Sequence, residues 1–483
     1  MKILSNGVSV LVLTLALGAC ATPPPPTVKP EDMPKAYQAP VPDTDKQVTA
    51  EWWKSFASSE LGGFIDEAHT GNLDLATAAA RLLQAQAQLG SATSSLFPSV
   101  DVTASANQVG YHGTKPSNTF GLKGAASYEL DVWGGNFNTM RSYRESSRAA
   151  VYYQQTTRLT TDANVAGAYF TVLALRERID VARKIVDAAK RILAITQAKV
   201  SNGVLSNLEL AQQTATVLGE EANIPVLEEK EREERNALAI LLGRMPGTLK
   251  VEGSSREGLA APPVQAGLPA TLLTRRPDVA QAEASLLAAH ANLDAARAAF
   301  LPGVSLSAGG GWSNTVLTGL ISPTSLAWNL GASVVQTIFD GGKLTSQRDY
   351  YKGREAELLA SYRTAVLDAL SDTETQLGSV ASYSEQERLT TDEVKNAQEA
   401  FRISELQYRE GVIDLLTVLQ AQQTLFTAQD TLIQIKLARL ESGVGLYRAL
   451  GGGWDVTQSA DADLRNTYVP VPDFTDLPIG LPC

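Results

Sequence analysis

The chain has 483 residues, of which 44% are hydrophobic and 19% are charged, a balance typical of a folded protein rather than a disordered one. It carries 41 lysines and arginines against 52 aspartates and glutamates, and this net charge of −11 argues against nucleic acid as a partner, because phosphates require a basic surface. The three histidines lie far apart in the sequence and the two cysteines lack metal-ligand spacing, so we expect a protein that is not an enzyme and holds no metal.

The N-terminus has the form of a secretory signal. Lys2 is followed by an apolar run from Val8 to Leu17, which is too short to remain as a membrane-spanning helix. The run ends in Leu17-Gly18-Ala19-Cys20, which resembles the bacterial lipobox, in which the cysteine is lipidated and becomes the new N-terminus. An ordinary signal with a chance cysteine is the alternative. We expect a signal peptide at 1–19, a covalent lipid on Cys20 with no other cofactor, and a proline-rich tether over 20–50.

The rest of the chain reads as a duplicated unit. Leu82-Leu83 matches Leu286-Leu287 at a distance of 204 positions, and Gly203-Val204 matches Gly411-Val412 at a distance of 208. An offset that drifts so little over a long span indicates an internal repeat. We therefore divide the chain into a first repeat at 51–252, a Gly-, Pro- and Ala-rich linker at 253–268, a second repeat at 269–454 and a C-terminal tail at 455–483.

Each repeat has the same order of predicted elements. An alanine-rich helix, at about 60–96 and about 271–300, is followed by two strands, a very long helix, a turn and a return helix. There is no proline from 135 to 224 or from 324 to 469, which permits long unbroken helices. A helix over 136–200 would be about 95 Å long. In the last return helix Val418, Leu425 and Leu432 recur every seven residues, the spacing of coiled-coil packing, although a simple core stripe would explain the same residues.

The predicted strands alternate strictly between apolar and polar residues. They cover 99–107, 119–130, 303–308 and 325–334. Strands of about ten residues cross a membrane with one lipid face and one wet face, although a soluble two-faced sheet has the same alternation. Four strands cannot close a barrel, since membrane barrels begin at about eight strands and open edges are not tolerated in lipid. If these strands enter a membrane, several chains must share one barrel, and three chains would supply twelve strands.

Several motifs together resemble a known family. They are Glu51-Trp52-Trp53, the doubled Gly-Val turn, Leu419-Gln420-Ala421-Gln422 and Leu450-Gly451-Gly452-Gly453-Trp454. Over about 51–454 the chain resembles the TolC-like outer-membrane efflux factors, in the lipoprotein branch typified by OprM and NodT. The resemblance implies a mixed α and β fold, in which a homotrimer combines a long α-helical coiled-coil barrel with a shared twelve-stranded transmembrane β-barrel.

The resemblance also implies a function. Such a protein is the exit duct of a tripartite pump in the bacterial outer membrane, anchored by lipid and extending into the periplasm. Its partners are a periplasmic membrane-fusion adaptor and an inner-membrane transporter, most often of the resistance-nodulation-division (RND) type. A passive outer-membrane porin and a structural lipoprotein without a pore are the alternatives. Because the net charge is negative, we also expect the lumen to favour cations.

Site residues follow by position in the family. The periplasmic tip, with its adaptor contact, would comprise Gly203, Val204, Leu205, Gly411, Val412 and Ile413. The glycines would permit the reversal of the chain because glycine accepts positive φ. Asp414, Leu416 and Gln420 would form the gate. Relatives often have an acidic residue where this chain has Gln420, and Asp414 could replace that charge or could simply cap a helix.

Overall fold

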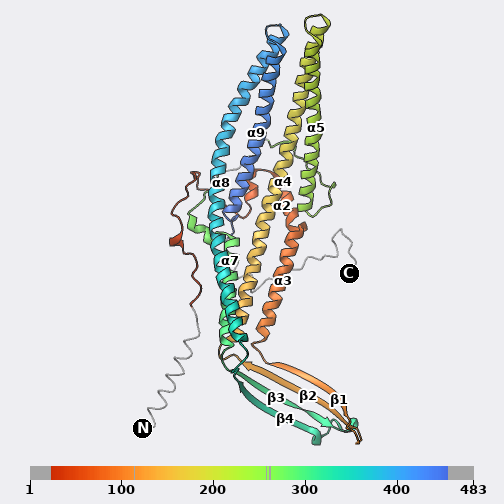
Figure 1. Cartoon of the computed structure of the whole chain (residues 1–483), viewed down its shortest axis with the longest axis vertical. Coiled ribbons are helices and arrows are strands. Elements are labelled where there is room, and N and C mark those ends of the chain that lie inside the picture. Colours follow the sequence, from red (N-terminus) through yellow and green to blue (C-terminus); the bar gives the residue numbers. More distant parts are fainter. Residues whose placement is uncertain (1–22, 114, 257, 260–262, 455–483) are drawn as a thin grey trace. The chain divides into compact units, whose positions relative to one another are not determined.

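The computed structural model describes residues 23–113, 115–256, 258–259 and 263–454 (Figure 1). The predicted signal peptide at 1–19, Cys20 and the tail at 455–483 lie outside the described residues. The chain divides into two compact units. The first, here called the strand unit, contains the described residues of 1–28, 80–152 and 280–365. The second, the hairpin unit, contains those of 29–79, 153–279 and 366–483.

The strand unit contains an antiparallel sheet in the order β1-β2-β3-β4 (Figure 1). Its strands are β1 (Ser99–Val109), β2 (Ser117–Leu130), β3 (Gly303–Asn314) and β4 (Leu326–Val335). All four predicted strands are confirmed. β3 extends six residues beyond the predicted end at 308, because the run Gly309–Gly311 has no side chains to continue the alternation that marks a strand. The short 3₁₀ helices η4 (Leu317–Gly319) and η5 (Pro323–Ser325) lie between β3 and β4.

The register of the strands places the apolar rows of residues on one face of the sheet and the polar rows on the other. One row of paired residues runs Ala104, Leu122, Trp312 and Leu326, and a polar row five positions away runs Ser99, Ser127, Ser307 and Gly331. Residues paired across antiparallel strands share a face, so the apolar rows all lie on one side. Val102 and Trp328 on that side are each 76% exposed. The described chain therefore leaves the apolar face of the sheet uncovered.

Capping residues set where the two longest helices begin. Asp131 accepts hydrogen bonds from the backbone N–H groups of Asn136 and Phe137, at 3.0 and 2.7 Å, at the start of α4 (Gly135–Ser201). Asp340 accepts from Gly342 and Leu344, at 2.9 and 2.8 Å, at the start of α8 (Lys343–Arg409). Each carboxylate thus pairs backbone donors that a helix start leaves free.

The hairpin unit contains two helix pairs, each made of the larger part of a long helix and its whole return helix. α4 turns back into α5 (Asn207–Leu241), and α8 turns back into α9 (Leu415–Ala449) (Figure 1). The predicted helix at 136–200 is confirmed by α4. α4 and α8 have 67 residues each, and α5 and α9 have 35 each. Arg178 on α4 and Asp430 on α9 form an ion pair of 2.6 Å, which joins the two helix pairs side by side.

Apolar residues from three helices form a core below the turns. They come from α4 (Ile185, Ala188, Ile192), α8 (Ala397, Phe401, Tyr408) and α9 (Leu415, Val418, Leu425, Phe426). Burying one such large side chain contributes about 1.5–3 kcal/mol. Val418 and Leu425 belong to the heptad row that the sequence predicts, and both are buried in this core. Among the described residues, no helix is both long and apolar enough to cross a membrane.

The two predicted alanine-rich helices are each broken into two, which corrects the sequence prediction. The first is α2 (Ser59–Gly71) and α3 (Leu73–Ser94), and the second is α6 (Leu272–Arg275) and α7 (Pro277–Ala298). Asn72 and Arg276 at the breaks are extended, with ψ of 129° and 119°. The Asn72 carboxamide oxygen accepts from the N–H groups of Asp74 and Leu75 and so begins a new helix, whereas Pro277 disfavours a helical Arg276.

The two breaks also meet the ends of the return helices. The Asn72 amide donates to the carbonyl of Leu241 at 2.8 Å, and the Arg276 guanidinium donates to the carbonyl of Ala449 at 3.3 Å. Both carbonyls lie in the last turn of a helix, where no backbone partner remains. The residue at each break of a helix therefore caps the end of another helix with its side chain.

The N-terminal segment packs on the hairpin unit. It contains η1 (Pro30–Asp32) and η2 (Trp52–Phe56), and η3 (Pro269–Thr271) follows the linker. The N–H groups of Gln38 and Ala39 donate to the Glu374 carboxylate at 2.8 and 3.0 Å. Trp52 is buried and stacks on Tyr447, with ring centroids 5.3 Å apart. The Glu-Trp-Trp motif thus lies against the end of α9, near the Gly-Gly-Gly-Trp motif that follows it.

Candidate functional site: the hairpin tips

Both hairpins reverse with the same backbone geometry. Gly203 and Gly411 have φ of +69° and +78°, a conformation that side chains resist and glycine accepts. The N–H of Val204 donates to the Lys199 carbonyl at 2.9 Å, and the N–H of Val412 donates to the Gln407 carbonyl at 2.8 Å. These bonds pair carbonyls at the helix ends and close each long helix at the residue before the turn.

Each return helix begins with a different capping residue. The hydroxyl of Ser206 accepts from the Leu208 N–H at the start of α5, and Glu209 completes a capping box by accepting from the Ser206 N–H. Asp414 caps α9 by accepting from the N–H and the hydroxyl of Thr417, at 2.9 and 2.7 Å. Hydrogen bonds from the Thr417 side chain and backbone lower the pKa of Asp414. The Asp414 carboxylate is therefore engaged within its own helix end.

The expected apolar patch at the tips divides into exposed and packed residues. Val204 is 68% exposed and Val412 is 70% exposed, at equivalent places in the two turns. Leu205 and Ile413, the next residues, pack against the core below the turns. Each tip thus exposes one valine, and the residue after that valine anchors the turn to the core.

Of the three expected gate residues, Leu416 and Gln420 lie on one exposed side of α9. Leu416 is 62% exposed, and Gln420 follows it by four residues, one helical turn farther along. Leu415 and Val418 are buried on the other side. Asp414 is also exposed, but it serves as the cap of the same helix.

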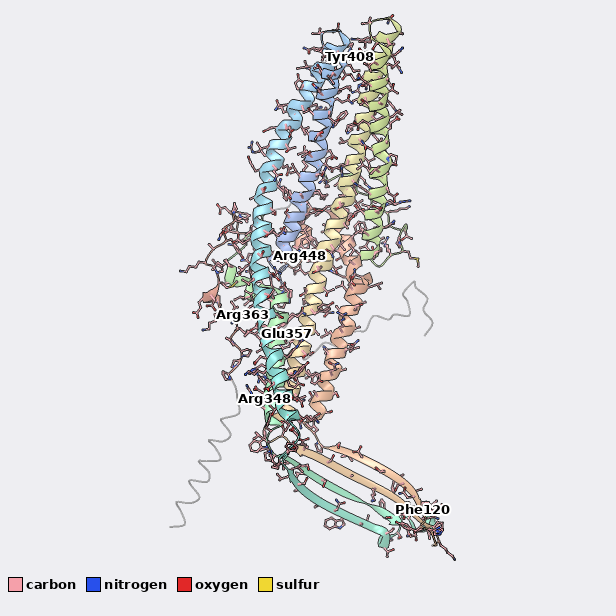
Figure 2. All side chains as sticks on the ribbon, viewed as in Figure 1. Phe120, Arg348, Glu357, Arg363, Tyr408 and Arg448 are labelled. Carbon is pink, nitrogen blue, oxygen red and sulfur yellow. The ribbon has the colours of Figure 1, made fainter. Side chains whose placement is uncertain are left out.

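A contact that the sequence does not predict ties the two hairpins together near their tips. Tyr408 of α8 is buried, and its hydroxyl lies 2.8 Å from the Thr196 hydroxyl of α4 (Figure 2). The Lys199 ammonium donates to the Tyr408 carbonyl and lies 4.4 Å from the centre of the Tyr408 ring. Burial raises the pKa of Tyr408. These residues are more than 200 positions apart, so no local pattern could reveal them.

The family model described as "Outer membrane efflux protein" matches residues 64–244 and 268–452, which include both hairpins and all four strands. The chain belongs to this family. It is 38% identical over 463 residues to the pyoverdine export outer membrane protein OpmQ of Pseudomonas aeruginosa, covering 93% of this chain and 97% of OpmQ. It is 31% identical to the probable efflux pump outer membrane protein TtgC of Pseudomonas putida, covering 92% and 95% of the two chains.

Solved structures of outer-membrane channels have the same fold. The chain superimposes on OprN with a TM-score of 0.83 at 27% identity, covering 90% of this chain and all of OprN. For the open state of MtrE of Neisseria gonorrhoeae the TM-score is 0.82 at 26% identity, covering 90% and 99%. As an outer membrane efflux protein, the chain is a channel component of an efflux pump in the outer membrane. This family membership does not favour the two alternatives, a passive porin and a scaffold without a pore.

Proposed function

We propose that three copies of the chain assemble into a duct whose twelve strands form one closed β-barrel in the outer membrane. The sheet of the strand unit carries this proposal, because one of its faces is apolar and exposed while β1 and β4 each have a single neighbour in the described chain. Lipid suits the apolar face, but it cannot satisfy the backbone groups of an open edge. Pairing β4 of one copy with β1 of the next would satisfy both edges.

The proposed duct is built from an internal two-fold repeat, with the boundaries expected from the sequence. The equal lengths of α4 and α8 and of α5 and α9 support this arrangement. Further support comes from Asn72 and Arg276, which cap the return helices from corresponding positions. We assign the channel no catalytic role.

The hairpin tips are the proposed periplasmic end of the duct. Val204 and Val412 would contact a periplasmic membrane-fusion adaptor, which in turn would join an inner-membrane transporter of the RND type. Leu416 and Gln420 would line the narrowest part of the lumen, with Asp414 holding the helix start beside them. A lipid on Cys20 would anchor the N-terminus in the outer membrane.

Small organic molecules are the proposed cargo. The names of the relatives refer to pyoverdine export and efflux pumps, and a siderophore of the pyoverdine type is the first candidate. Deletion of the gene should lower the amount of exported siderophore in the medium and raise the amount in the periplasm. Unchanged export in the deleted strain, with drug efflux lost, would assign the duct to other cargo.

Adjacent substitutions in β4 test the proposed barrel. Trp328 lies on the apolar face and Asn329 on the polar face, so Trp328→Arg would place a charge in lipid and Asn329→Arg would place it in the lumen. A charge on the lipid face costs about 2–4 kcal/mol near the bilayer midplane. We expect Trp328→Arg to lose the trimer on semi-native gels and the conductance in planar bilayers. Asn329→Arg should keep both and shift ion selectivity towards anions, and equal tolerance of the two changes would refute the barrel.

A further inference from the structure

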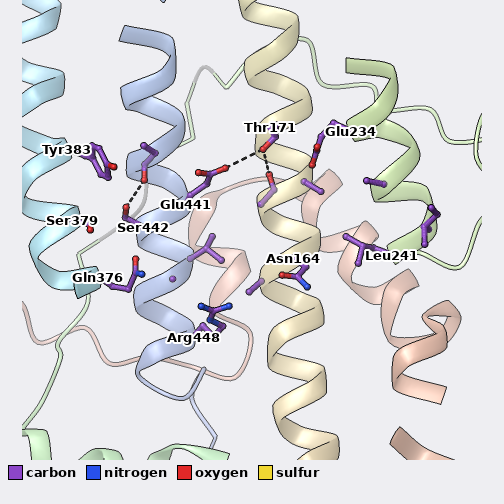
Figure 3. Close-up of a pocket in the computed structure, with 18 residues that line it drawn as sticks. Asn164, Thr171, Glu234, Leu241, Gln376, Ser379, Tyr383, Glu441, Ser442 and Arg448 are labelled. Atoms are coloured by element: carbon purple, nitrogen blue, oxygen red, sulfur yellow. Dashed lines mark hydrogen bonds between the residues drawn. The ribbon is translucent and has the colours of Figure 1, made fainter. Parts of the chain in front are cut away.

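An open cavity of about 760 Å³ lies among α4, α5, α8 and α9 in the hairpin unit (Figure 3). Glu234 of α5, Glu441 and Arg448 of α9 and Tyr383 of α8 supply its titratable and charged groups. Small and apolar residues, among them Ala163, Gly167 and Val444, supply the rest of the lining. A cavity of this volume, with a few polar groups among small and apolar residues, is the usual form of a small-molecule site.

The cavity lies on the side of the helices that the described neighbouring segments leave bare. Ala163, Gly167 and Thr171 line it from one face of α4. Tyr169 and Arg176 lie on the opposite face, where the Tyr169 hydroxyl donates to Glu60 at 3.0 Å and Arg176 donates to the Val251 carbonyl at 2.6 Å. In the proposed trimer the bare side is the wall of the lumen, so the cavity would meet molecules in transit.

Neither carboxylate of the cavity is in direct contact with a cationic side chain of the described residues, although the positive charge of Arg256 acts on Glu441 from a greater distance. Among the described residues, neither Glu234 nor Glu441 makes an ion pair within 4.0 Å. Glu441 accepts a long hydrogen bond of 3.4 Å from the Thr171 hydroxyl. Loss of hydration raises the pKa of Glu234, with a further contribution from the negative charge of Glu441, and loss of hydration also raises the pKa of Glu441. Both groups would gain from a cation that enters the cavity.

The residues that line the cavity suit an organic cation better than a metal ion. No group of three or more His, Cys, Asp or Glu side chains suited to a metal ion occurs in the described part of the chain, and the cavity is far larger than a bare ion. Ammonium groups bind carboxylates, and a methylene chain between them would contact the alanine, glycine and valine surface. We propose that the cavity binds an organic polyamine, with Glu234 and Glu441 each receiving an ammonium group. The site deepens the proposed function, since it places a cation-binding step on the path of export.

Calorimetric titration of the purified full chain with spermidine tests the site. Glu234→Gln with Glu441→Gln should weaken binding by about fivefold to tenfold, because exposed charge pairs are individually weak. Glu233→Gln with Glu393→Gln removes the same charge at exposed positions outside the cavity and should leave the affinity unchanged. Glu234→Gln alone should have an intermediate effect, and 1,8-octanediol, which lacks ammonium groups, should not bind.

The proposal is overturned if the unsubstituted chain does not bind spermidine, or if the two double variants weaken binding equally. Planar-bilayer conductance of the same samples separates this result from the proposed function. Normal conductance without spermidine binding removes the polyamine site and leaves the duct intact. Binding at Glu234 and Glu441 without any conductance supports the site while refuting the duct.

Discussion

Gln422 offers a direct test of the packing between the hairpins. Its side chain is 2% exposed in the core below the turns, and neither its amide nitrogen nor its oxygen has a hydrogen-bond partner among the described residues. A buried polar atom without a partner costs about 1–3 kcal/mol. Val418 and Leu425 flank Gln422 on the same side of α9, so leucine suits this position in both size and surroundings. We expect Gln422→Leu to raise the free energy of local opening of α9 by about 1–2 kcal/mol.

Hydrogen–deuterium exchange of peptides from α9 measures this free energy without requiring reversible unfolding of the whole assembly. A rise of about 1–2 kcal/mol slows exchange by about 5–30-fold. Gln423→Leu is the matched control, because Gln423 is exposed and its replacement should change the free energy by less than about 0.5 kcal/mol. Faster exchange in Gln422→Leu than in the unsubstituted chain would refute the reasoning, since it would mean that the amide makes bonds that leucine cannot replace.

Three further outcomes follow from the tips and the cavity. Tyr408→Phe removes the hydroxyl that meets Thr196 and should lower the free energy of unfolding by about 0.5–1.5 kcal/mol, with less additional loss when Thr196→Val is combined with it. Because the pKa of Asp414 is lowered, its carboxylate caps α9 at any pH above the ordinary aspartate pKa and loses this role as the pH falls through the lowered value. Hydrogen–deuterium exchange in the first turn of α9 should therefore accelerate in that low pH range. The variant Asp414→Asn should not show this acceleration. The raised pKa values of Glu234 and Glu441 mean that the folded chain keeps protons that the unfolded chain releases. As the pH rises from the ordinary glutamate pKa to the raised values, thermal stability should therefore fall and spermidine binding should strengthen. Replacing both glutamates by Gln should abolish these two changes.

Most of the fold could be predicted from the sequence, because its helices and strands leave regular patterns that extend over many residues. Absence of proline indicated α4 and α8, and strict alternation indicated the four strands, because both signals extend over many residues. The helix break at Asn72 was missed because it depends on one side chain that bonds to its own backbone and to a distant carbonyl. The end of β3 was missed because three glycines interrupt the alternation.

At the tips, local chemistry was readable and contacts between the hairpins were not. Gly203 and Gly411 mark turns by their residue type alone, and Ser206 three positions before Glu209 is a recognisable helix start. Tyr408 and Thr196 carry no such signal, since their hydroxyls meet only when two separate hairpins pack. The cavity around Glu234 depends on four helices and is hidden in the sequence for the same reason.

Corresponding positions in the two halves of the chain share geometry more than chemistry. Gly243 lies so close to the Gly71 carbonyl, and Gly451 to the Arg275 carbonyl, that a side chain at either glycine would collide with backbone. The neighbouring caps differ: an amide at Asn72, but at Arg276 a buried guanidinium that also pairs with Asp278 and Asp372 at 2.6 and 3.2 Å. Backbone proximity restricts the glycines to one residue type, whereas a helix-end carbonyl accepts any donor of suitable reach. A duplicated architecture of this kind can keep its packing while its sequences diverge, which explains why corresponding positions keep glycine in both halves but carry different capping residues.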